Sequence, residues 1–369
     1  MRKEEILTWV VYGLMFLVAL FVGLQIIAPA FVETGIVGPE QYAYAIITIA
    51  VGFIFNVILL EIAHVIGALI GGYTIQMVNI LSLAYFKVGK QWQIGIRPYD
   101  GLTGETKVSA KTDKANPFPN LWFGLLFFIL EILVLFPMAY LLFPEDQWGR
   151  YALIITIAIG AILMVYNYMP FKLDSMTDGY KLALTNRQMS KGDPSYNELI
   201  RIEKAYAEGQ HPGTIQTFDR FTGVTTQIML YQIYEWLVSE SYTEALGLLE
   251  KIYEQRDKLP DLLVNRVFSQ KLYAVLMDKP LNEGSKYYFE KLSSKQKRFL
   301  ANDLSMESLR AYLLVAGTIE DSYSECVFVL ERQNKALKRT VEPGRQQAEQ
   351  ILFDRALAIV KKRHKDWKF

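Results

Sequence analysis

A glutamate and a histidine three residues apart, Glu61 and His64, form the pair in this sequence best suited to chemistry. At that spacing two side chains share one face of a helix. Both lie in an apolar run from about 44 to 70. Ionisable side chains are energetically costly inside a membrane segment, so their presence there suggests a functional site. Glu-x-x-His is also the second part of the zinc-hydrolase pattern H-E-x-x-H, but Leu60 stands where that pattern has its first histidine.

In a zinc hydrolase of this kind, the two histidines bind the metal and the glutamate is the general base for the metal-bound water. A third protein ligand comes from elsewhere in the chain. Here the last apolar run ends in Asn167-Tyr168-Met169-Pro170, which leads into Asp174 and then Asp178-Gly179. Either aspartate is a candidate for the third ligand.

Four long apolar runs in the first 170 residues must position these side chains. Each run is long enough to cross a bilayer, so we predict four transmembrane helices. The second helix carries Asn56, Leu60 and His64 four apart, so they stack on one face. The third carries Glu131, which either pairs with His64 or Asn56 or stays protonated, because burial disfavours the charged form. We expect the spans at about 6–31, 42–70, 121–143 and 151–169.

The segment from about 73 to 114 is rich in aromatic and β-branched residues and alternates in polarity, which predicts strands with a hairpin turning near Gly89. It is also basic, like the N-terminus and the stretch after the fourth span, whereas the two opposite loops offer only Arg150. The positive-inside rule then places both termini in the cytoplasm.

Residues 191–369 read as helices with apolar stripes, and we expect a cytoplasmic all-α domain, solenoid-like or a bundle. The fold class is thus mainly α and integral to the membrane, with a membrane core at 1–190. The 369-residue chain is 51% hydrophobic with a net charge of +1, so no strong field favours nucleic acid as a partner. We expect a bacterial cell membrane as its location.

Taken together, the motifs resemble the site-2 protease family of intramembrane zinc metallopeptidases. That family has H-E-x-x-H on one span and, two spans later, Asn-x-x-Pro followed by an Asp-Gly that carries the third ligand. Glu61 to His64, Asn167 to Pro170 and Asp178-Gly179 match that order and spacing. The basic strands after the first motif look like the membrane-associated strands of the family, which can pair with an extended substrate. The resemblance covers about residues 40–180.

The resemblance implies that Glu61 is the general base and that His64 and Asp178 are zinc ligands. Asp174 competes with Asp178, which we favour because glycine follows it. Accessory candidates are Asn56, Glu131 and Asn167. Leu60 departs from the family pattern, because leucine has no donor atom and two ligands hold zinc far more weakly than three.

Three functions remain open. The favoured one is a pseudoprotease that binds a transmembrane or extended peptide without cutting it, with a second, cytoplasmic protein partner at 191–369. The second is an active intramembrane zinc endopeptidase with an incomplete or borrowed ligand set. The third is a structural or transport-associated membrane protein. The cofactor is zinc in the second case and none in the others; the lipid bilayer is a partner in all three.

Overall fold

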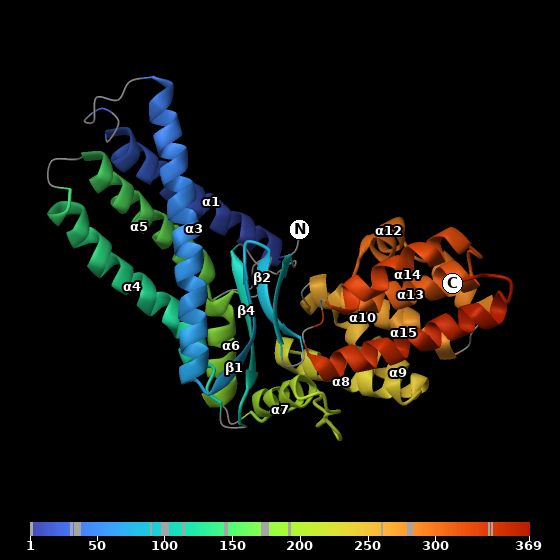
Figure 1. Cartoon of the computed structure of the whole chain (residues 1–369). Helices are drawn as coiled ribbons and strands as arrows, with labels where there is room; N and C mark the ends of the chain where they lie inside the picture. Colours follow the sequence, from blue (N-terminus) through green and yellow to red (C-terminus); the bar gives the residue numbers. More distant parts are fainter. Residues whose placement is uncertain are drawn as a thin grey trace. The chain divides into compact units, whose positions relative to one another are not determined.

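The computed structural model of the chain describes residues 3–29, 32, 38–88, 91–96, 103–112, 115–143, 147–170, 177–190, 193–259, 261–278, 283–338, 340 and 342–369. The chain divides into two compact units, Met1–Gly192 and Asp193–Phe369. Figure 1 shows the helices and strands of each unit, which are described separately below.

The first unit contains four helices long and apolar enough to cross a membrane, as the sequence predicts. Their candidate spans are Ile6–Gln25, Tyr42–Ile70, Phe118–Leu141 and Trp148–Asn167. They belong to α1 (Lys3–Val22), which continues into the π-helical turn η1 (Gly23–Ile27), α3 (Pro39–Ile70), α4 (Phe118–Leu141) and α5 (Gln147–Asn167). Many large apolar side chains on α1, α3 and α4 are exposed, as suits helices that face lipid.

Five span boundaries differ from the prediction by two to six residues, among them the start of the third span and the end of the first. The third span was expected from 121, but α4 begins at Phe118 and includes Pro119 in its first turn. The first turn has no intrahelical acceptor for its N–H groups, so proline is tolerated there. The first span was expected to reach 31, whereas its candidate crossing ends at Gln25, inside the π-helical turn.

Helices α3, α4 and α5 pack against one another, and α1 packs on α5. Contact between α1 and α5 is partly aromatic, because Tyr12 and Tyr166 stack with ring centroids 6.2 Å apart. After α5 and a segment outside the described residues, α6 (Asp178–Ser190) returns to contact α4. The three-helix group α3–α4–α5 therefore forms the framework that holds the polar side chains.

An antiparallel sheet follows α3, in the order β3-β2-β1-β4. Its strands are β1 (Tyr73–Ile80), β2 (Leu83–Val88), β3 (Gln91–Ile96) and β4 (Gly104–Ala110). The expected hairpin is confirmed, since β2 pairs β3 up to Val88 opposite Gln91; Gly89 itself lies outside the described residues. A bulge between Ile75 and Met77 shifts the pairing of β1 with β4.

One face of this sheet is apolar and exposed at its β2–β3 end. The register places Leu83 opposite Ile96 and Tyr85 opposite Ile94, so their side chains share a face. Ile94 and Ile96 are 73% and 83% exposed. We call this surface the outer apolar face; it consists of Leu83, Tyr85, Trp92, Ile94 and Ile96.

The second unit is a helical bundle built around α13 (Met306–Thr318), in which every residue from Met306 to Gly317 is buried. Helices α10, α12, α14 and α15 contact it. Complete burial of a central helix favours the bundle over the solenoid, both of which the sequence left open. The other elements are α7 (Ser195–Ala207), α8 (Gly223–Val238), α9 (Tyr242–Glu254), η2 (Arg256–Lys258), α10 (Asp261–Asp278), α11 (Glu283–Glu290), α12 (Ser294–Asn302), α14 (Tyr323–Leu337) and α15 (Pro343–Arg363).

A buried ionic network lies in this bundle beside its apolar core. Glu307 on α13 contacts Arg345 at 2.7 Å and Arg266 at 3.4 Å. Burial alone raises the pKa of Glu307, but the charges of Arg345 and Arg266 outweigh it and hold the pKa well below its usual range. Arg310 pairs with Glu349 at 3.5 Å. Breaking such a pair leaves an uncompensated buried charge, so this network ties α13 to α10 and α15.

Candidate functional site

His64 joins three parts of the first unit. Its Nε2 lies 3.0 Å from Asp178 Oδ2, and its Nδ1–H donates to the carbonyl oxygen of Asn120 at 2.8 Å. Both ring nitrogens thus face acceptors, and a histidine that donates from both nitrogens is an imidazolium. We therefore read the contact with Asp178 as an ion pair between the end of α3 and the start of α6.

Asp178 is prepared for this contact by its own neighbours. Asn167 Nδ2 donates to Asp178 Oδ2 at 2.6 Å, and the Asp178 N–H donates to Asn167 Oδ1 at 3.3 Å. Lys181 Nζ is 3.7 Å from Oδ1. Burial by itself raises the pKa of Asp178, but the charge and hydrogen bond of His64 reverse this and hold the pKa far below its usual range. The carboxyl group is therefore ionised.

Two close backbone contacts bring these residues together, and both require glycine. A Cβ at Gly179 would lie 2.3 Å from the carbonyl carbon and oxygen of Tyr168, so only glycine lets α6 start against the end of α5. A Cβ at Gly67 would lie 2.3 Å from the carbonyl oxygen of Pro119. Gly67, one turn after His64, thus lets α3 approach the start of α4 closely enough for His64 to reach Asn120.

Glu61 lies on the same helix but has a different partner. Thr106 Oγ1 on β4 donates to Glu61 Oε2 at 2.5 Å, and Glu61 is 2% exposed. A Cβ at Gly104, also on β4, would lie 2.8 Å from Glu61 Oε1. Strand β4 therefore covers the carboxylate directly, on the same side of the sheet that continues into the outer apolar face.

Leu60, at the position of the missing histidine, is part of the apolar core. It is buried in a cluster with Val57, Leu163 and Met164, against which Tyr168 also packs. The Tyr168 hydroxyl donates to the Leu121 carbonyl oxygen and accepts from the Leu125 N–H, so it is inserted into the hydrogen bonding of α4. Leu60 thus contributes packing where a ligand would be needed.

His64, Asp178 and Leu60 do not fit a zinc site. Structural and catalytic zinc sites have three or four protein ligands, and here His64 and Asp178 contact each other while Leu60 supplies no donor. Within the described part of the chain, no group of three or more His, Cys, Asp or Glu side chains is placed to hold a metal ion. We therefore derive no step through a metal.

The remaining predicted site residues fall into three groups. Asn167 lies with His64 and Asp178, as described above. Asn56 and Glu131 lie together elsewhere in the bundle: they flank Gly160, where an added Cβ would be 2.4 Å from Asn56 Oδ1 and 2.9 Å from Glu131 Oε2. Asp174 lies outside the described residues.

Sequence reasoning missed three contributors to the site. Asn120 acts through its backbone carbonyl, so its side chain gives no signal. Thr106 depends on strand register, which the sequence did not fix. Tyr168 was quoted only as a spacer between Asn167 and Pro170, although a tyrosine at the end of a span needs a hydrogen-bond partner when buried.

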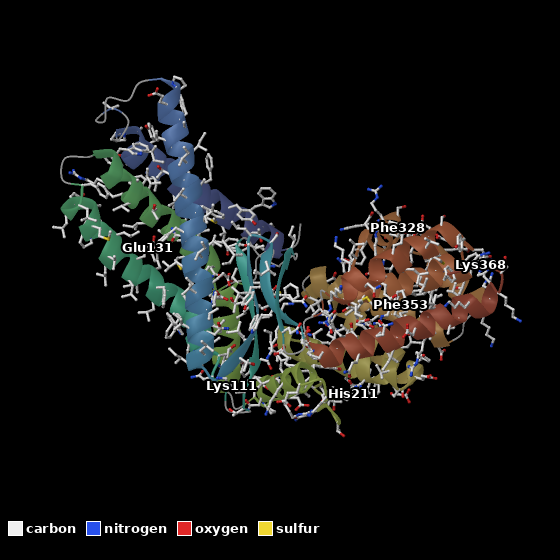
Figure 2. The ribbon with its side chains drawn as sticks, in the orientation of Figure 1. Lys111, Glu131, His211, Phe328, Phe353 and Lys368 are labelled. Carbon is white, nitrogen blue, oxygen red and sulfur yellow. The ribbon has the colours of Figure 1, made fainter. Side chains whose placement is uncertain are left out.

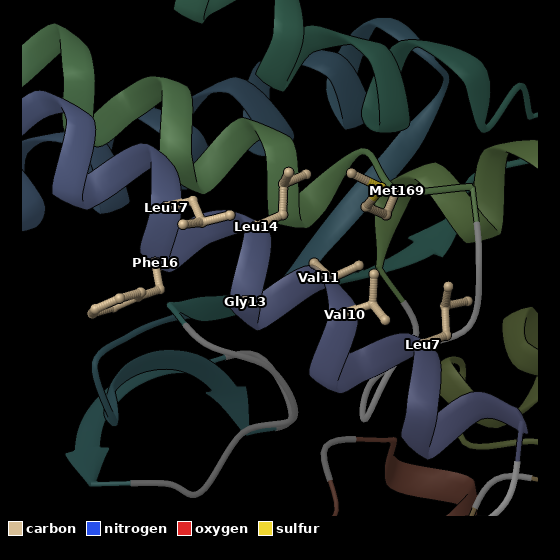
Figure 3. A pocket seen from close by; sticks show the side chains of 8 residues that line it. All are labelled: Leu7, Val10, Val11, Gly13, Leu14, Phe16, Leu17 and Met169. Carbon is tan, nitrogen blue, oxygen red and sulfur yellow. The ribbon is translucent and has the colours of Figure 1, made fainter.

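A separate apolar hollow lies along α1 in the first unit. Figure 3 shows its lining side chains, which come from α1 except for Met169 just after α5. The residues are Leu7, Val10, Val11, Gly13, Leu14, Phe16, Leu17 and Met169. Because no polar side chain lines it, the hollow suits binding of an acyl chain or an apolar helix and offers no group for catalysis.

Comparisons of the chain with protein-family models, with curated proteins and with solved structures found no match.

Proposed function

We propose that this protein is a site-2-protease-like membrane protein that binds a transmembrane or extended peptide without cleaving it. The observation that carries the proposal is the state of His64: both nitrogens are bonded to protein oxygens, and its partner Asp178 is held by Asn167. A hydrolytic centre needs an electrophile and a free base, whereas these polar groups satisfy one another.

The sheet supports a binding role. The outer edge of β3 pairs with no strand among the described residues, and such an edge can accept an added strand. The outer apolar face lies beside that edge and continues towards the β4 residues that cover Glu61. A peptide that leaves the membrane in extended form would find backbone partners on β3 and an apolar surface next to them.

Orientation belongs to the same proposal. The positive-inside rule favours the basic 73–114 segment, both termini and the second unit on the cytoplasmic side. The proposed location is a bacterial cell membrane. The helical bundle would then be available to a cytoplasmic protein partner. Reaction of single introduced cysteines with a membrane-impermeant thiol reagent in intact cells tests this, with buried Cys326 as the background.

The central test is zinc content, measured by mass spectrometry on detergent-purified protein, for the wild type and Leu60→His. Val57→His is the matched control: it places a histidine in the same buried cluster but two turns from His64 instead of one. We expect little zinc in the wild type and in Val57→His, and near-stoichiometric zinc in Leu60→His.

Two outcomes would contradict the proposal. Stoichiometric zinc in the wild type, together with cleavage of a transmembrane peptide, would favour an active endopeptidase that borrows a ligand. A folded Leu60→His protein without zinc would remove the support for a metallopeptidase ancestry and favour the structural or transport-associated reading.

A further inference from the structure

A second polar site lies in the α3–α4–α5 bundle, centred on Glu131. This residue, labelled in Figure 2, is in the middle of α4 and is 5% exposed. Leu130, Ile132, Leu133 and Val134 around it are exposed. Neither carboxyl oxygen accepts a hydrogen bond of normal geometry from the described residues. A carboxylate buried in this way would be uncompensated, which is unfavourable inside a membrane.

Asn56 on α3 determines which hydrogen bond Glu131 can make with it. Both hydrogens of the Asn56 amide are already used, because Nδ2 donates to the Gly52 carbonyl oxygen at 2.9 Å and to the Thr156 carbonyl oxygen at 3.0 Å. The same two acceptors fix the orientation of the amide. Only Oδ1 is left, and an amide oxygen can only accept. A hydrogen bond between these neighbours therefore needs a hydrogen on Glu131.

Gly160 on α5 makes room for this contact. An added Cβ would lie 2.4 Å from Asn56 Oδ1, 2.9 Å from Glu131 Oε2 and 2.9 Å from Phe128 Cε2. The two oxygens thus face the same spot on α5, which only a hydrogen atom can occupy. The site is also distinct from the His64–Asp178 pair, since Asn56 precedes His64 by eight residues, about 12 Å along the helix.

From this geometry we propose that Glu131 is a proton-binding site within the membrane bundle, held as the neutral carboxylic acid and donating to Asn56 Oδ1. It ties α3, α4 and α5 together at a depth where an ionised group would be unpaired. The alternative occupant of the same oxygens is a sodium ion bound to the ionised carboxylate, and the experiment separates the two.

The test is infrared difference spectroscopy of the full-length protein in lipid, wild type minus Glu131→Gln. We expect the wild type to show one additional carbonyl band of a protonated carboxylic acid, unchanged when sodium is replaced by choline. Glu131→Gln should keep the wild-type unfolding midpoint, because its amide also donates to Asn56 Oδ1, whereas Glu131→Leu should lower it.

Three results would overturn the proposal. The first is a loss of carboxylate bands, instead of the acid band, in the variant. The second is an acid band that appears only when sodium is withdrawn, which would assign the site to the cation. The third is a Glu131→Gln protein as unstable as Glu131→Leu, which would show that Glu131 needs its charge. Zinc content does not bear on any of these readouts, so this proposal and the pseudoprotease proposal stand or fall separately.

Discussion

Replacing Asp178 by asparagine isolates the ion pair on which the candidate site depends. The substitution keeps the size of the side chain and an oxygen for Asn167, but it removes the negative charge that contacts the His64 ring. His64 and Asp178 are 8% and 7% exposed, so solvent screens neither group well. Breaking a buried pair from one side costs about 3–5 kcal/mol, or between about 10²- and 10⁴-fold in the unfolding equilibrium.

The measurement is equilibrium unfolding in mixed micelles titrated with dodecyl sulfate, with a chelator present throughout. His64→Gln and the double variant complete a double-mutant cycle. If the two residues interact directly, the double variant should lose less free energy of unfolding than the sum of the single losses, by roughly 2 kcal/mol or more.

Additive losses within about 0.5 kcal/mol would refute the ion-pair reading, because they mean that the two side chains act independently. A second result would refute it in another way. If the chelator alone destabilises the wild type but not the double variant, the two residues act through a metal and not through each other.

Two further perturbations test contacts elsewhere in the chain. Gly67→Ala should destabilise the first unit by about 1–3 kcal/mol, since its Cβ would meet the Pro119 carbonyl oxygen at 2.3 Å. Gly13→Ala is the control: its Cβ would meet nothing within 4 Å, so it should not destabilise the protein in the same dodecyl sulfate titration. Glu307→Gln should cost roughly 3 kcal/mol by leaving Arg345 and Arg266 without a counter-charge, measured as faster hydrogen exchange of α13 in the full chain. Folding lowers the pKa of Glu307, so the stabilisation by this carboxylate is present above the unfolded-state pKa of about 4.5 and is lost as the pH falls below it. Acidification should therefore narrow the difference in stability between the wild type and Glu307→Gln.

The sequence predicted the four spans because runs of about twenty predominantly apolar residues have few alternatives to a membrane helix. Their starts were harder to place. Pro117 and Pro119 suggested a break before 121, but a proline in the first turn costs a helix nothing, and α4 begins at Phe118. The approach of His64 to Asp178 follows from Gly67 and Gly179, whose role depends on which backbone they face and is invisible in a single sequence.

Strand register explains why the contact of Glu61 was not foreseen. The bulge at Gln76 places Thr106 opposite Val78, on the side of the sheet that meets α3. Without that extra residue, Glu105 would stand opposite Val78, because a one-residue shift exchanges the two faces of a strand. Glu105 there would present a second carboxylate to Glu61. The bulge carries no glycine or proline, so nothing in the local sequence marks it.

A stabilising role does not explain why a glutamate is buried at position 61. It is a carboxyl side chain 2% exposed, and among the described residues Thr106 is the one side chain that donates a hydrogen bond to it. Exchanging both members of such a buried polar pair for apolar residues is often neutral or stabilising. We therefore expect Glu61→Leu/Thr106→Val to unfold at the wild-type dodecyl sulfate concentration or above it, and Thr106→Val alone to be destabilised by about 1–3 kcal/mol because it strands the carboxyl group.

If the double variant is as stable as the wild type, the Glu61–Thr106 contact is not required for folding, and its presence points to a role in binding the proposed peptide. A loss of about 3 kcal/mol or more in the double variant would lead to the opposite conclusion. Glu61 would then be a structural contact between α3 and β4, comparable with the His64–Asp178 pair, and the polar residues of this unit would serve to hold the sheet on the helices rather than to recognise a peptide.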